Sequence, residues 1–293
     1  MKKSKTTDTS FVADIFKSLA IFGCSLLILQ FIGGFLFLGL IIYVYRDRDC
    51  TTKRTANLKH IEQLKATNKC PNCNLGNANL RNLDLTKANL KKAKLVEAKL
   101  DGVNLQEANL SRAELSWHDT YNGHHIGAYP TCEVEISASL KNANLRDAKL
   151  NWAKLKQVNL KSANLSNAKL RGTELIRANL ESANLQNAYL TKANLSLAKL
   201  KSANLQNSNL QYADLSNADL SYSDLRNTDL QNANLQDTNL QYADLSYSDL
   251  RNTDLRKTYL DDTFLAGAKY DVTTIFSQDF NPQQKRMIFI EPY

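Results

Sequence analysis

One feature constrains the fold of this chain more than any other: leucine occupies every fifth position from Leu140 to Leu265. A shorter run in the same phase extends from Leu75 to Leu115. The residue two before almost every leucine is small, most often alanine, and the residue directly before the leucine is most often Asn or Asp. A pattern that holds over 35 leucines indicates an internal repeat of five residues.

A period of five differs from the periods of the common secondary structures, which are 3.6 for a helix, 3.5 for a coiled coil and 2 for a strand. It fits a chain that makes one short extended segment and one corner per repeat. Residues two apart in an extended segment point to the same side, so each leucine and the small residue before it face inward. Asn and Asp suit the corner because their side chains bond nearby backbone groups and tolerate unusual dihedral angles. We therefore predict a coil wound around stacked leucines.

The repeats resemble the A-(D/N)-L-x-x units of the pentapeptide-repeat family, as in Ala143-Asn144-Leu145, Ala213-Asp214-Leu215 and Ala218-Asp219-Leu220. The resemblance covers roughly residues 73–281. It implies an all-β fold, a right-handed quadrilateral β-helix with four repeats in each turn. About function the resemblance says little.

The N-terminal region carries a long apolar stretch. Residues 18–45 are 28 residues without a charge, preceded by the polar segment 1–17. About 20 apolar residues span a bilayer, and the terminal Tyr43 and Tyr45 are typical of an interface, so we predict a transmembrane helix. The alternative, a cleaved signal peptide, has a shorter apolar region. Four lysines precede the stretch and five Lys or Arg follow closely, so the positive-inside rule favours a cytoplasmic solenoid by one charge.

The linker 46–72 contains the pattern of a short helix, with Asn57 as its N-cap. Three apolar residues are expected on one face of this helix: Leu58, Ile61 and Leu64. This face suits a lid on the first coil of the solenoid. His60 is expected to be solvated.

Cys70 and Cys73 form a C-P-N-C motif at the start of the repeats, with Cys73 in a small inward position. Three interpretations stay open. The cysteines are a reduced pair, a disulfide in an oxidising compartment, or half of a zinc or redox site that lacks its second C-x-x-C. Pentapeptide-repeat proteins often open with a similar helix and C-P-x-C, which by resemblance implies an N-terminal cap.

Residues 116–137 interrupt the two repeat runs, 73–115 and 138–265, without changing their phase. This excursion is either a bulged coil or a loop that leaves the coil and rejoins it. It collects metal-ligand residue types, but at spacings that match no known site: His118, His124, His125 and Cys132. Irregular loops on solenoids often contact partners. The candidate contact residues of the excursion are Trp117, His118, His124, His125 and Tyr129.

Charge is distributed unevenly along the repeats. Residues 138–200 hold 11 basic and 3 acidic residues, whereas residues 201–265 hold 5 basic and 10 acidic residues. The basic half could attract anionic lipid or nucleic acid, or could be an ordinary solvated surface.

A coil of 20 residues would stack like residues in the acidic half. Asp224 would lie beside Asp244, and Asp229 beside Asp249. Stacked carboxylates either bind a cation or splay into water, and we expect the second. Tyr222 and Tyr242 would also stack, which makes them a further candidate for partner contact.

The end of the chain, 266–293, departs from the repeat. Similar solenoids carry an aromatic C-terminal plug, which implies that Phe276 and Phe280 cover the last leucines. The apolar run at 287–293 is either an additional cap strand or a contact segment.

The sequence contains no nucleophile–base arrangement, phosphate loop or convincing metal set, so no catalytic, cofactor or metal residues are predicted. It favours a non-enzymatic scaffold or protein-binding module tethered to a lipid bilayer, with an unidentified protein partner. Some pentapeptide-repeat proteins mimic duplex DNA and bind type II topoisomerases. By that resemblance, the alternative is topoisomerase binding through the acidic end 201–265. Nucleic acid is not an expected partner, and the oligomeric state is left open.

Overall fold

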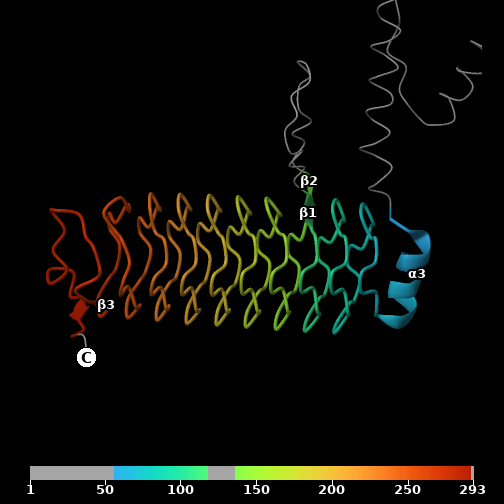
Figure 1. Cartoon of the computed structure of the whole chain (residues 1–293), viewed down its shortest axis with the longest axis horizontal. Helices are drawn as coiled ribbons and strands as arrows, with labels where there is room; N and C mark the ends of the chain where they lie inside the picture. The colour runs from blue at the N-terminus through green and yellow to red at the C-terminus, as the bar shows by residue number, and fades with distance from the viewer. Residues whose placement is uncertain (1–55, 118–135, 292–293) are drawn as a thin grey trace, which may run out of the picture. The chain divides into compact units, whose positions relative to one another are not determined.

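The structure, a computed structural model, describes residues 56–117 and 136–291. The predicted span 18–45 lies outside these residues, and no helix within them is long and apolar enough to cross a membrane. The helix and strands occur in the order α3 (Leu58–Thr67), β1 (Ser116–Trp117), β2 (Ile136–Ser137), β3 (Lys269–Tyr270) and β4 (Ile288–Phe289). Between them the chain winds in successive coils (Figure 1), which single parallel bridges join to one another.

The bridges establish the period of the coil. Most join residues 20 apart, as in Asn144 to Asn164 and Asn164 to Asn184, and the four that cross the excursion join residues 40 apart; all fall into four series. Each series is one wall of a four-sided column. We number the walls 1 to 4 by their bridged residues in the first complete coil, which are Asn74, Asn79, Asp84 and Asn89. The predicted all-β coil of four repeats per turn is confirmed.

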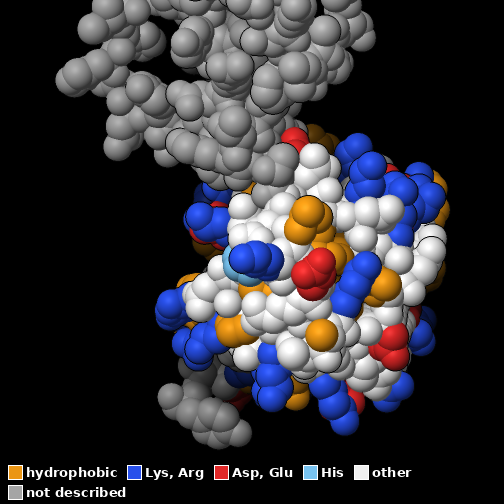
Figure 2. Space-filling model, turned by 90° about the vertical axis from the view of Figure 1, so that its right-hand side faces the viewer, with side chains coloured by type: hydrophobic (Ala, Val, Ile, Leu, Met, Phe, Trp, Pro, Cys, Tyr) orange, Lys and Arg blue, Asp and Glu red, His pale blue; other side chains and the backbone are white. Residues whose placement is uncertain are grey.

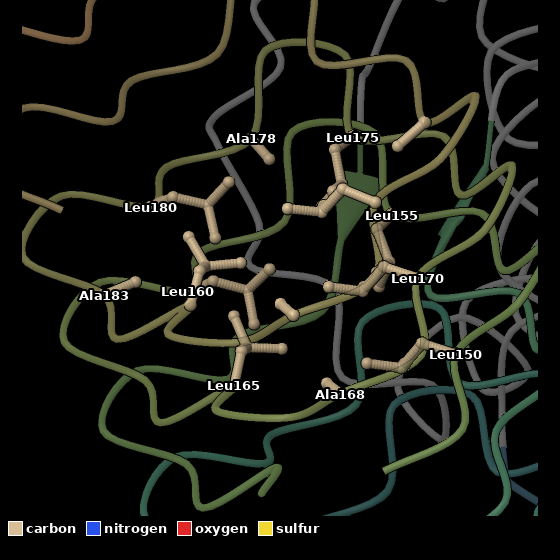
Figure 3. Packing of buried hydrophobic residues seen from close by; sticks show 14 of the residues in the cluster. Leu150, Leu155, Leu160, Leu165, Ala168, Leu170, Leu175, Ala178, Leu180 and Ala183 are labelled. Carbon is tan, nitrogen blue, oxygen red and sulfur yellow. The ribbon is translucent and has the colours of Figure 1, made fainter. Parts of the chain in front are cut away.

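The leucines fill the column. Every leucine of the two runs is buried except Leu260, which is partly buried. Figure 3 shows Leu150, Leu155, Leu160 and Leu165, one from each wall, pointing into the same interior. The residues two positions earlier are buried beside them, except Leu83 and Thr258, which are partly buried. Fully burying one leucine side chain stabilises a fold by roughly 1.5–3 kcal/mol, so the stacked leucines dominate the stability of the column.

The corners differ from the sequence prediction. The Asn or Asp before each leucine lies on a wall, where its backbone is held extended by bridges to both neighbouring coils. The left-handed residue is the one two positions after almost every leucine, for example Lys92 with φ 58° and Tyr242 with φ 60°. The wall residue still supports the corner, because Asn164 Oδ1 accepts a hydrogen bond from the Ser166 N–H at 3.1 Å. Asn and Asp therefore stabilise the corner from outside it.

The coils on either side of the excursion are bridged directly to each other. Lys99 bridges Ser139 directly, and Glu114 bridges Lys154 directly, so no coil lies between them. Strands β1 and β2 pair antiparallel, with Trp117 opposite Ile136. The chain therefore leaves and re-enters at the corner between walls 1 and 2. Of the two alternatives, the bulged coil is wrong.

Helix α3 forms the predicted lid, with one correction. Asn57 caps it by accepting the Lys59 N–H at 3.0 Å, and Leu64 is buried against the column. Ile61 is partly buried, but the Leu58 side chain is 74% exposed. Residues three apart on a helix are displaced by about 60° around its axis, so the three apolar residues spread over about 120° and the first turns away.

His60 has a structural role that the sequence prediction missed. Its Nδ1 atom accepts the Asn74 N–H at 3.0 Å, and the Asn57 N–H donates to the Asn74 carbonyl at 3.1 Å. These two bonds satisfy the backbone of wall 1 in the first coil, which has no coil beneath it. The cap thus covers an edge that would otherwise be open for pairing.

The C-terminal cap agrees with prediction. Phe276 and Phe280 stack with ring centroids 4.8 Å apart and pack, partly buried, against the core. Strand β4 pairs parallel with β3, so the apolar end of the chain supplies the additional cap strand.

Candidate functional site

The stacked tyrosines lie on the corner between walls 2 and 3. The ring centroids of Tyr222 and Tyr242 are 4.9 Å apart with an interplanar angle of 16°, as the 20-residue coil predicts. Lys201 Nζ lies 5.3 Å from the Tyr222 centroid on the coil before. On the coil after, the charge of Asp262 and its hydrogen bond raise the pKa of the Tyr242 phenol. The corner therefore carries a ladder of Lys201, Tyr222, Tyr242 and Asp262, one side chain per coil.

Three further aromatic side chains surround this ladder. Phe264 follows Asp244 on wall 3, and Tyr259 follows Asn239 on wall 2. Tyr247 lies at the corner after wall 3, where its ring packs over Gly267. We call these exposed residues the aromatic patch: Tyr222, Tyr242, Tyr247, Tyr259 and Phe264.

Sequence reasoning found two residues of the aromatic patch and missed three. Tyr259 and Phe264 occupy the position directly before a leucine, where Asn or Asp is the rule, and that departure was an available signal. Tyr247 occupies the same left-handed corner position as Tyr242, five residues later. Placing each residue on its wall by the 20-residue period would have grouped all three with the tyrosine pair.

The stacked carboxylates neither splay into water nor require a bound cation. Arg226 pairs with Asp224 at 2.6 Å and approaches Asp244 at 3.7 Å, and its hydrogen bond lowers the pKa of the Asp224 carboxyl. Arg251 pairs with Asp249 at 2.7 Å in the same manner. The expectation of splaying was wrong because one aspartate of each stacked pair, Asp224 or Asp249, has an arginine two residues later that supplies compensating charge. Among the described residues, no three His, Cys, Asp or Glu side chains gather as a metal site would require.

Cys70 and Cys73 are joined by a disulfide beneath the N-terminal cap, with their Cα atoms 5.4 Å apart. Both side chains are buried. Because Lys69 bridges Asn89, the coil begins one repeat earlier than the sequence indicated, and Cys70 occupies the leucine position of this additional repeat. The Cys70 Sγ atom also lies 3.2 Å from the His60 carbonyl oxygen. A reduced thiol could donate a hydrogen bond to this oxygen, whereas a disulfide sulfur has no proton to donate. Of the three open interpretations, the structure has the disulfide.

The excursion leaves most of its candidate residues untested. Trp117 lies in β1. The other candidates are outside the described residues: His118, His124, His125, Tyr129 and Cys132. Their role in partner contact stays a prediction.

A recess of ≈ 420 Å³ lies where the end of α3 meets the first coil. Leu64, Lys65 and Asp84 are among the residues that line it. The Asp84 carboxylate accepts the Thr86 hydroxyl at 2.6 Å, and this bond lowers the pKa of Asp84. The recess therefore contains an already bonded carboxylate and no nucleophile–base pair among its lining residues.

The repeats match a known family. The model described as "Pentapeptide repeats (8 copies)" matches residues 70–102, 92–119, 136–161, 159–196, 198–237 and 233–269. These segments cover more than half of the chain and include almost every coil. A search of curated proteins finds no match.

Solved structures of several repeat proteins are similar to this chain. HetL, a pentapeptide repeat protein involved in heterocyst differentiation regulation in the cyanobacterium Nostoc sp. strain PCC 7120, is 29% identical over 73% of this chain and 97% of its own, with a TM-score of 0.33. The pentapeptide repeat protein alr5209 of Nostoc PCC 7120 is 34% identical over 36% of this chain and 84% of its own, with a TM-score of 0.31. Trypsin-treated QnrB1, a plasmid-mediated fluoroquinolone resistance protein, is 18% identical over 62% of this chain and 89% of its own, with a TM-score of 0.42.

Proposed function

This chain belongs to the pentapeptide-repeat family, and from that premise we propose that it is a non-enzymatic, membrane-tethered module that binds a protein partner. Proteins of this family are in general structural or binding proteins rather than enzymes. The observation that carries the proposal is the aromatic patch, which a rigid column presents to its surroundings.

The aromatic patch has the chemistry of a protein interface. Its five side chains are between 47% and 63% exposed, which is unusual for so many large rings within three coils. Tyr and Phe are enriched at interfaces, where they contribute large contact areas with few rotatable bonds. The coils beneath are bonded to their neighbours through the backbone, so little order is lost when a partner binds.

Site-specific photo-crosslinking tests the partner contact. We expect a crosslinking residue at Tyr242 of the full chain to give a discrete adduct in the native cell. Substituting Tyr222 and Phe264 with serine should reduce that adduct about tenfold or more, because contacts at the centre of an interface dominate affinity. Tyr189 on wall 4 is the matched control, since it is 55% exposed but remote from the aromatic patch. Equal adducts from Tyr242 and Tyr189, or none from Tyr242, would contradict the proposal.

The tether is supported by the sequence of residues 18–45 and has a separate test. A reporter fused to the C-terminus should follow the membrane fraction and show cytoplasmic activity, and removal of residues 1–45 should release it. Recovery of the full chain in the soluble fraction would refute the tether. Activity on the oxidising side would instead reverse the orientation and favour a persistent Cys70–Cys73 disulfide.

A topoisomerase-binding function through residues 201–265 is the second proposal. It rests on the excess of acidic residues in this end. The ion pairs of Asp224, Asp249 and Asp254 with neighbouring arginines reduce the negative charge that this end presents. Protection of gyrase in a supercoiling assay would support this function over the first proposal.

A further inference from the structure

Wall 4 and the corner that follows it differ from the rest of the column in charge. From residue 89 to residue 192, the outward positions of this surface include Lys and Arg but no Asp or Glu. All of the basic side chains are exposed. We call them the basic wall: Lys91, Lys92, Arg112, Lys149, Lys169, Arg171 and Lys192.

The other surfaces of the same coils carry acidic residues as well, several of them in stacked ion pairs. Lys154 bonds Glu114 at 3.3 Å, Lys156 bonds Glu174 at 3.3 Å, and Lys161 bonds Glu181 at 2.6 Å. By contrast, no residue of the basic wall makes an ion pair with another described residue. Seen from the α3 end, Lys and Arg side chains project from the rim of the column (Figure 2). Among the four surfaces of these described coils, the basic wall is the one that carries basic residues without any acidic residue.

Exposed aromatic rings accompany these charges. Trp152 is 50% exposed, and Tyr189 and Tyr212 are each 55% exposed. Lys192 Nζ lies 5.9 Å from the Tyr212 centroid. The Trp152 ring packs over Gly172, where a side chain would not fit, because a Cβ atom at residue 172 would clash with three atoms of the six-membered ring. The surface thus combines Lys and Arg side chains, which make no ion pair with a described residue, with Trp and Tyr rings, each of which has both an apolar and a polar edge.

We propose that the basic wall docks on the surface of an anionic lipid bilayer and lays the column along the membrane. Lys and Arg near such a surface are attracted by its headgroups, and Trp and Tyr favour the interface between headgroups and acyl chains. From Asn89 to Tyr189, four bridges connect the successive coils of this surface, which therefore extends over about 19 Å at about 4.8 Å for each step. This straight series matches a planar surface better than the basic groove in which single-stranded nucleic acid binds.

The inference rests on the tether of the proposed function, which brings this surface within reach of lipid. Between the end of the predicted span and the start of α3 lie residues 46–57. Twelve residues extend at most about 40 Å, so the first coils are held near the bilayer at high effective concentration. The basic wall begins in those first coils.

Fluorescence of Trp152 provides the test. The chain has two tryptophans, and the substitution Trp117→Phe makes Trp152 the single tryptophan. The full chain with this substitution is reconstituted in vesicles that contain brominated lipid, either phosphatidylcholine alone or phosphatidylcholine with phosphatidylglycerol. We expect quenching of Trp152 fluorescence only in the anionic vesicles, with reversal at high salt. Replacing Lys149, Lys169, Arg171 and Lys192 with glutamine should reduce the docked fraction relative to the undocked fraction several-hundredfold, since each charge contributes about fivefold.

A charge-matched variant on the opposite surface is the control. It carries glutamine at four lysines of wall 2 and the corner after it: Lys141, Lys161, Lys199 and Lys201. This variant should retain quenching. Equal quenching in neutral vesicles, loss in both variants, or shielding of Trp152 by a single-stranded oligonucleotide without lipid would overturn the inference. Flotation with the neutral vesicles reports on the tether alone, so failure of the tether and failure of the docking surface are distinguishable.

Discussion

At the scale of the residue, each repeat separates the side chains that stabilise it from those that face outward. Leucine and the small residue before it fill the interior, and the other three positions are free to vary in chemistry. Apart from Cys70, whose repeat was missed, the inward set could be predicted from the spacing of five. The left-handed position could not, because residues as different as Lys92, Glu107, Trp152 and Tyr242 occupy it. Its conformation is imposed by the bonds between coils rather than by residue type.

The leucine column predicts unequal effects of equal truncations. Leu165→Ala removes a fully buried side chain in the middle of the column and should lower the free energy of unfolding by about 2–5 kcal/mol. Leu260→Ala should cost less, because that side chain is only partly buried. Urea denaturation of the two variants measures the difference. Equal losses would show that burial in the column does not determine the energy.

The inward hydroxyl groups predict two opposite results from the same kind of change. Thr238 Oγ1 donates to the Leu215 carbonyl one coil below at 2.9 Å, whereas the buried Ser208 hydroxyl has no partner among the described residues. An unsatisfied buried group costs about 1–3 kcal/mol. Thermal unfolding should therefore show that Ser208→Ala raises stability and Thr238→Ala lowers it. A loss of stability in Ser208→Ala would mean that its hydroxyl is satisfied in solution.

At the scale of the element, the column depends on caps at both of its open ends. The N-terminal helix was predictable from a short local pattern, and the C-terminal aromatic plug from the resemblance to similar solenoids. The roles of His60 and Leu58 were not, because they depend on how the helix is rotated against the first coil. A pattern of apolar residues fixes that rotation only to within the width of the apolar face.

His60 predicts local opening of the first coil. His60→Ala removes the acceptor of the Asn74 N–H and should cost about 1–3 kcal/mol at that end of the column. Amide hydrogen exchange should quicken around Asn74 and stay unchanged in the central coils. Leu58→Ala on the same helix is the control, since its side chain is largely exposed and should be neutral. Unchanged exchange at Asn74 in the His60 variant would contradict the capping role.

The excursion predicts a tolerated deletion. Removing residues 117–136 joins Ser116 to Ser137, which restores a step of five residues from Leu115 to Leu140. The coil should keep its stability, because Lys99 already bridges Ser139. Deleting 117–137 removes one residue more, which leaves a step of four and should destabilise wall 2. If chemical denaturation shows equal stability for the two deletions, or a collapse of the first, the excursion is part of the coil.

At the scale of the whole molecule, the column explains why the fold was more predictable than the function. Every coil repeats one requirement, so an error at any one residue leaves the prediction of the fold unchanged. Surfaces such as the aromatic patch and the basic wall arise only when residues 20 apart are brought together. Sequence reasoning placed Tyr222 with Tyr242 in this way but did not extend the placement to every outward residue, so wall 4 went unnoticed.

The central claim, one coil for every 20 residues, is tested most directly by distances between spin labels along one corner. Labels introduced at Asn142 and, in turn, at Ser202, Tyr222 or Asp262 should be separated by about 14, 19 and 29 Å, because each coil adds about 4.8 Å. Electron paramagnetic resonance measures these separations in the intact chain. Increments of about 4.8 Å for each 20 residues are the predicted result. Separations that grow by about 1.5 Å for each residue, as in a helix, or that show no regular increment would contradict the account.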